Sequence, residues 1–255
     1  MLRARLIPCL LIHKGGLVKT VNFAEPKYIG DPINTVRIFN EKEVDELFVV
    51  DIDASVHGVE PNYELISHLA AECRMPLCYG GGVKTVEQIE KIIKLGVEKV
   101  ALSSAAVQNP TVVSDAAIRV GCQSVVVVID VKRVGVLQSY EVVTHNGTRK
   151  SGIKPVDFAR QMASAGAGEI VINSVDNDGK RVGYDQKQVD LIRKEINLPI
   201  TILGGAGSME DVRNLISRYG IIGAAAGSLF VLKGKYNAVL VNYPNIEEKE
   251  KLTTI

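Results

Sequence analysis

The sequence carries one carboxylate at a position typical of catalytic acids in α/β proteins. Asp130 ends the segment Val125–Asp130, in which four valines and an isoleucine precede the acid. An unbroken apolar run of this length predicts a strand that is buried on both faces, as in a parallel sheet. The carboxyl ends of such strands usually hold the chemistry of α/β folds. Asp130 is therefore the first candidate for an acid or base, and the alternative is a strand-end Asp that caps the next turn.

Two glycine–serine pairs with equal spacing indicate anion-binding loops. Gly81 precedes Ser104 by 23 positions, and Gly205 precedes Ser228 by the same distance along the chain. Glycines let backbone N–H groups approach a ligand, and a serine at a helix start adds a hydroxyl beside the positive end of the helix. Each half of the chain is thus predicted to bind one phosphate, with plain glycine turns as the alternative. The candidate residues are Gly81, Gly82, Ser103, Ser104, Asp178, Gly179, Gly204, Gly205, Gly227 and Ser228.

The elements that position these residues are eight apolar segments, each followed by a candidate helix. The predicted strands are Leu6–Ile12, Glu46–Ile52, Met75–Tyr79, Lys99–Leu102, Val125–Asp130, Glu169–Asn173, Pro199–Leu203 and Ile222–Ala226. Alternation of strand and helix indicates a parallel sheet, and eight units indicate a closed (β/α)8 TIM barrel. A capping box at Thr85–Gln88 predicts a helix that stops at Gly96, and Lys187–Asn197 predicts another. We expect one domain over residues 1–255, with half-barrels of about 1–120 and 121–245 related by the internal repeat.

Three segments depart from the minimal barrel unit. The loop from Lys14 to Asp31 is long and contains several glycines, so it is expected to be a mobile lid. Strands at Val134–Val143 and Arg149–Ile153 flank Asn146-Gly147, which predicts a β-hairpin after the fifth strand. The charged tail, Glu247–Lys251, is expected to fray.

The first strand lacks the acid that its counterpart carries. Under the two-fold repeat, Leu11 matches Asp130, whereas an acid/base pair would place one carboxylate in each half. His13, two residues on, has either a loop-surface role or a catalytic role in place of the missing acid. Lys19 in the long loop either closes over a phosphate or is an ordinary solvated lysine.

Four charged residues stand at the beginnings of predicted strands, namely Arg5, Glu46, Lys99 and Glu169. Alternation along the strands places Lys99 with Ser103, and Glu169 with Asn173, on shared faces. If these faces point inward, two cations and two anions close the barrel floor as an ion-paired ring. Glu46 fits less well, since its alternation with Asp51 is off by one. From the residue types alone, the favoured interpretation is that these are ordinary charges on the bottom face of the barrel and contribute to stability.

Composition narrows the class of protein. The 255 residues are 46% hydrophobic, and the net charge of +1 gives no bulk field for nucleic acid or membrane. The apolar segment Leu6–Ile12 is too short for a membrane span or a signal sequence. The four cysteines form no zinc set and are expected to be reduced thiols in a cytoplasmic protein, with no metal or cofactor. They are Cys9, Cys73, Cys78 and Cys122.

Motifs along nearly the whole chain resemble the HisF family, the cyclase subunit of imidazole glycerol phosphate synthase. They include Cys9-Leu10, Val18-Lys19, Gly30-Asp31-Pro32, Asp45-Glu46-Leu47, Gly80–Gly82, Lys99-Val100, Ile129-Asp130, Gly166–Glu169, Asp178-Gly179, Gly183–Asp185 and Gly204–Gly207. The resemblance implies a two-part glutamine amidotransferase, in which a HisH-type glutaminase docks on the barrel floor and releases ammonia. It also implies that Arg5, Glu46, Lys99 and Glu169 form a gate, which overturns the purely structural interpretation. The family substrate is a bisphosphorylated ribulosyl-formimino aminoimidazole carboxamide.

The chain departs from the family at three positions. Leu11 stands where the family has its first catalytic aspartate, Leu203 replaces a serine, and Ser103 replaces an asparagine. Loss of a positioned general acid costs about 10²–10⁴-fold in rate. This pattern resembles HisF-like paralogues that act beside a HisH-like partner and a sugar amidotransferase in surface-polysaccharide pathways. The alternatives are a genuine cyclase of histidine biosynthesis and a non-catalytic scaffold that binds a phosphorylated ligand and activates a glutaminase.

Overall fold

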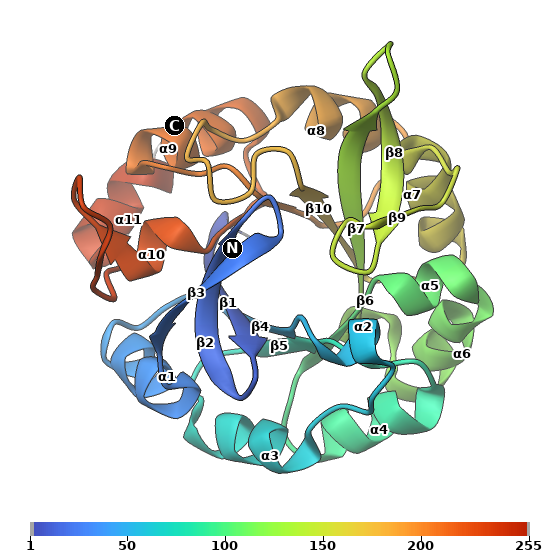
Figure 1. Ribbon diagram of the computed structural model, residues 1–255, viewed down its shortest axis with the longest axis horizontal. Coiled ribbons are helices and arrows are strands. Elements are labelled where there is room, and N and C mark those ends of the chain that lie inside the picture. Colours follow the sequence, from blue (N-terminus) through green and yellow to red (C-terminus); the bar gives the residue numbers. More distant parts are fainter. Residues whose placement is uncertain (1–2, 254–255) are drawn as a thin grey trace.

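The computed structural model describes residues 3–253 and contains a closed barrel of eight parallel strands (Figure 1). Each strand pairs with the next, and the last, β12, pairs with β1, so the barrel has no free edge. The barrel strands are β1 (Arg5–His13), β4 (Leu47–Asp51), β5 (Leu77–Gly80), β6 (Lys99–Leu102), β7 (Val125–Val134), β10 (Glu169–Ser174), β11 (Ile200–Leu203) and β12 (Gly223–Ala226). The predicted TIM barrel is confirmed, with strand limits shifted by a few residues.

Helices surround the strands and cover the outer face of the barrel (Figure 1). The longer ones are α1 (Pro32–Glu41), α3 (Tyr63–Glu72), α4 (Val86–Lys94), α6 (Thr111–Val120), α7 (Pro155–Ser164), α8 (Gln186–Arg193), α9 (Met209–Tyr219) and α11 (Ile246–Thr253). Shorter ones follow barrel strands, namely α2 (Ala54–His57), α5 (Ser104–Gln108) and α10 (Ser228–Val231), and the single turn η1 (Cys122–Ser124) precedes β7. Thr85 and Gln88 form the predicted capping box at the start of α4. The helix predicted at Lys187–Asn197 is α8, which ends earlier, at Arg193.

The apolar residues form two cores, one on each face of the strands. The larger lies between strands and helices, where Leu6, Leu10 and Ile12 of β1 point. The smaller fills the barrel interior, and it is made of Ile7, Cys9, Phe48, Cys78, Ala101, Val126, Val128, Val171, Leu203 and Ala225. Alternation along each strand therefore divides its side chains between the two cores, which explains the continuous apolar runs in the sequence.

The long segment after the first barrel strand has more regular structure than expected. The loop from Lys14 to Asp31, expected to be a mobile lid, folds mostly as a hairpin of β2 (Gly16–Val21) and β3 (Ala24–Gly30). β2 continues the sheet beyond the barrel by pairing antiparallel with the end of β1. The segment is thus a hairpin and not an irregular loop, and its movement as a lid stays a prediction.

The hairpin after the fifth barrel strand is confirmed with different limits. The predicted strand Val134–Val143 is divided, since β7 ends at Val134 and β8 (Ser139–Thr144) begins after a turn at Gly135. β8 then pairs with the short β9 (Arg149–Lys150) around the predicted Asn146-Gly147 turn. A second small hairpin, β13 (Leu232–Lys233) with β14 (Ala238–Val239), follows α10. No helix among residues 3–253 combines the length and hydropathy needed to cross a membrane.

The charged tail folds, contrary to the prediction that it frays. Residues 246–253 form α11, and its Leu252 side chain is buried, 4% exposed, in the outer core. Lys249 adds a bond from Nζ to Asp45 Oδ1 at 3.1 Å. The sequence-based expectation failed because charge dominates the tail, whereas one buried leucine and contacts with distant residues determine its position.

We expect Leu252→Ala to lower the free energy of unfolding by about 2 kcal/mol or more, since it removes a buried side chain. Urea denaturation followed by circular dichroism measures this loss. Lys251→Ala, which changes an exposed neighbour on the same helix, is the matched control and should change stability by less than about 0.5 kcal/mol. Equal effects of the two substitutions would show that α11 does not dock through Leu252.

Candidate functional site

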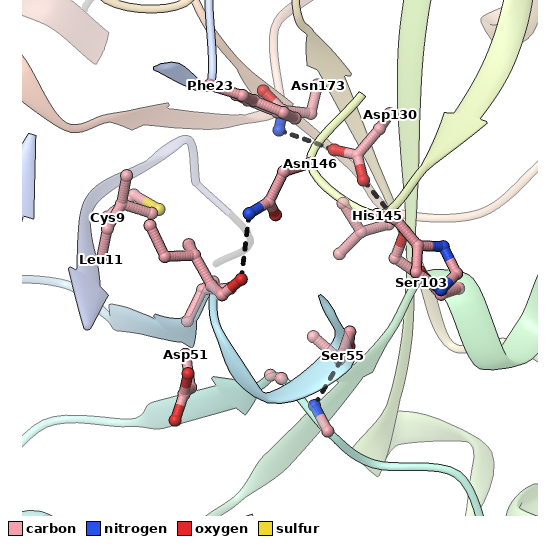
Figure 2. A pocket seen from close by; sticks show the side chains of 18 of the residues that line it. Cys9, Leu11, Phe23, Asp51, Ser55, Ser103, Asp130, His145, Asn146 and Asn173 are labelled. Atoms are coloured by element: carbon pink, nitrogen blue, oxygen red, sulfur yellow. Dashed lines mark hydrogen bonds between the residues drawn. The ribbon is translucent and has the colours of Figure 1, made fainter. Parts of the chain in front are cut away.

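A pocket opens at the carboxyl ends of the barrel strands, and Asp130 lies in its wall (Figure 2). Its polar lining is Thr20, Asp51, Ser55, Ser103, Ser104, Asp130, His145, Asn146 and Asn173. The glycines of the first predicted phosphate loop, Gly81 and Gly82, line the same pocket. Leu11 and Leu203 are among its apolar residues. At both positions the sequence has a leucine where the HisF pattern has a polar side chain, and both leucines face this pocket.

Asp130 is held by two hydrogen bonds in a half-buried position. Asn173 Nδ2 donates to Asp130 Oδ1 at 2.8 Å, and Ser103 Oγ donates to Oδ2 at 2.9 Å. Burial raises the pKa of Asp130 to about 6, and the two donors act in the opposite direction because they favour the charged form. A carboxyl group with this pKa can hold or release a proton near neutral pH, which is the requirement for acid/base catalysis.

The second set of predicted phosphate ligands surrounds a smaller hollow beside the first pocket. It is lined by Lys19, Asp178, Gly179, Gly204, Gly205, Gly227 and Ser228, and Leu11 and Leu203 border both spaces. The backbone requires glycine at Gly205, because φ is +109° and a Cβ there would lie 2.1 Å from Gly183 O. The structure thus groups the residues as predicted, and phosphate binding at both places stays a prediction.

Lys19 is buried, so the interpretation as a solvated lysine is wrong. Its Nζ donates to Cys9 O at 2.6 Å and lies against Gly227, where a Cβ would be 2.2 Å from it. Burial lowers the pKa of Lys19, and nearby Asp178 partly opposes this shift. A cation at this edge of the hollow suits an anionic ligand.

His13 lies outside both spaces. Its Nδ1 is 2.7 Å from Asp53 Oδ1, in a pair at the end of β1 that is part of the loop surface. Although burial acts against ionisation, the Lys14 N–H and His13 lower the pKa of Asp53. This position favours the loop-surface role over catalysis in place of the missing acid.

Sequence reasoning missed several polar groups in the mouth pocket, among them Asp51 as a pocket residue, His145 and Asn146. Burial raises the pKa of Asp51, whose Oδ1 accepts bonds from the backbone N–H groups of Asp53 and Ala54. Asn146, at the tip of the β8–β9 hairpin, donates to Ile52 O at 3.0 Å and so folds the hairpin over the pocket. The Asn-Gly signal located this turn in the sequence, but no local pattern placed it over the mouth.

The four charged residues at the beginnings of the strands meet at the opposite end of the barrel. Arg5 bonds to Glu46, and its second amino group donates to Glu169 Oε1 at 2.7 Å. Lys99 Nζ lies 2.9 Å from Glu46 Oε1 and 3.0 Å from Glu169 Oε2, which closes the ring. Thr201, missed by sequence reasoning, donates to Glu169 Oε1 at 2.5 Å.

Both carboxylates of this ring are 5% exposed, whereas the two cations are partly open to solvent. Burial works against ionisation of Glu169, but Arg5 and Lys99 outweigh it and lower the pKa of Glu169 to about 2. Burial acts to lower the pKa of Lys99, but Glu169 and Glu46 outweigh it and raise that pKa. Glu169 and Lys99 are therefore both charged at neutral pH.

A small apolar cavity lies directly inside the ring. Ile7, Phe48, Cys78, Val126 and Val171 line it together with Glu46, Glu169 and Thr201. Phe48 also lines the mouth pocket, so its side chain borders both spaces. Among residues 3–253, no group of three or more His, Cys, Asp or Glu side chains is placed to hold a metal ion.

Fold and site define a (β/α)8 barrel with an acid-bearing pocket at one end and a closed ring of charges at the other. Residues 5–237 match the model of a family described as histidine biosynthesis protein. The chain belongs to this family, and its relatives place it among the HisF-like proteins.

Three relatives illustrate the range of similarity. A Leptospira borgpetersenii protein, named provisionally as imidazole glycerol phosphate synthase subunit HisF, is 55% identical over 99% of both chains. A Pseudomonas aeruginosa protein with a similarly provisional name, subunit hisF2, is 50% identical over 97% of this chain and 98% of its own. The imidazole glycerol phosphate synthase subunit HisF of Hyphomonas neptunium is 42% identical over 90% of each chain.

We expect Asp130 to titrate with an apparent pKa of about 6 and Ser103→Ala to raise that value, because the substitution removes a donor to the charged form. The carboxyl ¹³C shift of Asp130, assigned by its loss in Asp130→Asn, measures both values by NMR. Ser104→Ala, which changes the residue next to Ser103 and leaves both hydrogen bonds to the carboxylate in place, serves as the control. A pKa near 4, or one unchanged by Ser103→Ala, would contradict this account of the site.

Proposed function

We propose that this chain is the ammonia-receiving synthase subunit of a two-part glutamine amidotransferase. The observation that carries the proposal is the alignment of three features along the barrel axis: the charged ring, the apolar interior and the acid-bearing mouth pocket. Ammonia is small and uncharged, so an apolar passage conducts it more readily than it conducts ammonium or metal ions. The ring is the gate at the entrance, and a HisH-like glutaminase is the partner that docks at this N-terminal face.

The mouth pocket and the adjoining hollow are proposed to bind a phosphorylated small molecule. Gly81, Gly82 and Ser104 in the first space, and Gly205 and Ser228 in the second, supply backbone and hydroxyl groups suited to phosphate. Asp130 is the proposed acid/base: as ammonia adds to a carbonyl carbon of the acceptor, the C=O π bond breaks onto the oxygen, and the carboxylate takes the proton that the nitrogen loses and passes it to that oxygen. The reaction takes place in the cytoplasm and needs no further cofactor.

The particular reaction we favour is the supply of glutamine-derived ammonia for sugar amidation in surface-polysaccharide biosynthesis, alongside a sugar amidotransferase. Leu11 supports this choice, since an aliphatic side chain faces the pocket where a second acid is needed for ring closure. The names of the relatives fit too. Proteins with numbered names such as hisF2 and hisF3 are 50–55% identical, against 40–42% for those named without qualification.

Two other functions compete with this one. A genuine cyclase of histidine biosynthesis gains support from Asp51, a half-buried carboxyl group that lines the same pocket as Asp130. A non-catalytic scaffold that binds a phosphorylated ligand and activates a glutaminase needs the phosphate loops but no passage through the barrel. The two experiments below separate these functions.

The first experiment tests ring closure. With ammonium salt and the phosphoribulosyl-formimino substrate of the HisF family, we expect the pure chain to be at least about 10²-fold slower than Leu11→Asp, because the substitution restores a second acid. Leu11→Asn, which has a similar shape and no titrating proton, is the matched control and should stay slow. Rapid ring closure by the unaltered chain would establish the cyclase and exclude the sugar-amidation proposal.

The second experiment tests the gate. In a complex with a HisH-type glutaminase, Lys99→Met should uncouple glutamine hydrolysis from use of the ammonia, because it opens the ring of ion pairs. The ratio of product formed to glutamate released measures coupling. Arg3→Met, which alters an exposed charge at the same face, is the control and should keep the ratio near that of the unaltered complex. Full coupling with Lys99→Met would favour the scaffold.

A further inference from the structure

One buried oxygen in the mouth pocket has no hydrogen-bond partner among residues 3–253. Asn173 is 6% exposed and lines the pocket, and while its Nδ2 donates to Asp130, its Oδ1 is unpaired. A buried acceptor without a partner is costly, and native structures usually reserve such an atom for water or a ligand. Figure 2 shows Asn173 beside Asp130 at the wall of the pocket.

The neighbouring side chains fix which end of the amide faces Asp130. An ionised carboxylate accepts hydrogen bonds only, so the amide must present its NH2 group to Asp130 and its oxygen elsewhere. The Ser103 hydroxyl donates its one proton to Asp130 Oδ2, so it cannot also donate to Asn173 Oδ1. Asn173 Oδ1 is thus left as an acceptor for something that enters the pocket.

Asn173 also lies on the route from the charged ring. Glu169, Val171 and Asn173 occupy alternate positions on β10 and face inward, at steps of about 7 Å along the strand. Glu169 belongs to the ring and Val171 to the apolar interior. A molecule that rises past Val171 therefore reaches an unpaired acceptor at the next inward position of this strand.

We propose that Asn173 Oδ1 receives ammonia as it leaves the barrel interior, by accepting a hydrogen bond from one N–H. This inference rests on the proposed function and assigns a positioning residue within it. Ammonia has three N–H donors and one lone pair, and the lone pair must stay free to attack the acceptor. A site that offers acceptors holds the molecule by its hydrogens, whereas a donor would occupy the lone pair. The neighbouring Asp130 carboxylate then lies ready to take the proton that the attacking nitrogen releases.

Rubidium is a suitable probe, because Rb⁺ resembles ammonium in size, prefers oxygen ligands and gives an anomalous X-ray signal. We expect crystals of the isolated chain soaked in rubidium chloride to show an anomalous peak in contact with Asn173 Oδ1. Asn173→Leu should abolish the peak. Ser174→Ala should keep it, since Ser174 Oγ is likewise buried and unpaired but belongs to the next residue of β10, which points to the opposite face.

Two results would overturn the inference. One is the absence of a peak at Asn173 Oδ1 in the unaltered protein. The other is a peak of equal height in Asn173→Leu, which would mean that the Asp130 carboxylate attracts an adventitious ion only. The soak needs neither glutaminase nor acceptor, so its failure leaves the gate experiment untouched. Full coupling with Lys99→Met would instead overturn the proposed function, and the two failures are therefore distinguishable.

Discussion

The ion-paired ring at the barrel floor is the constraint on which the rest of the structure depends. Glu46 and Glu169 are almost completely buried, and a buried carboxylate is tolerated only when it is neutralised and hydrogen-bonded. Arg5 and Lys99 each contact both acids, so every charge has two opposite neighbours. Because the four residues come from different parts of the chain, the ring forms only when strands β1, β6 and β10 and the start of β4 are in register.

A gradient of polarity runs from this ring to the mouth. The interior above the ring contains apolar side chains and two thiols, and polar groups return only at the level of Ser103, Asp130 and Asn173. Burial acts to raise the pKa of both acids, but the net shift has opposite signs at the two ends. At the floor, Arg5 and Lys99 outweigh burial and lower the pKa of Glu169 to about 2, whereas at the mouth no cation within residues 3–253 forms an ion pair with Asp130 and burial raises its pKa to about 6. One acid is locked in its charged form, and the other is free to exchange a proton.

Local patterns predicted the fold well, because barrel strands are short apolar runs and helix starts carry their own signals. The helix at Thr85 and the strand at Lys99–Leu102 needed no tertiary information. The tail was mispredicted, since it is held by distant partners in the outer core around Leu252. The Lys14–Asp31 segment contains strands that were not predicted, because it pairs with the end of β1 immediately before it in the sequence. Such contacts leave no periodic trace in the sequence.

The site was predictable in part. Alternation along strands correctly placed Arg5, Lys99 and Glu169 on inward faces, but it argued against Glu46 because Asp51 was used as the reference. Asp51 is the last residue of β4 and accepts backbone bonds from the following turn, whereas Glu46 shares its inward face with Phe48 and Val50. The unpaired state of Asn173 Oδ1 depends on two neighbours from other strands, so only coordinates reveal it.

The central claim is that ammonia travels inside the barrel, and isotope competition tests it most directly. The complex with a HisH-type glutaminase would be supplied with [amide-¹⁵N]glutamine in the presence of excess unlabelled ammonium, and the label in the aminated product would be read by mass spectrometry. Internal passage predicts product labelled to nearly the enrichment of the glutamine amide, whatever the ammonium concentration. Product labelled only to the enrichment of the mixed ammonia pool in solution would contradict the account.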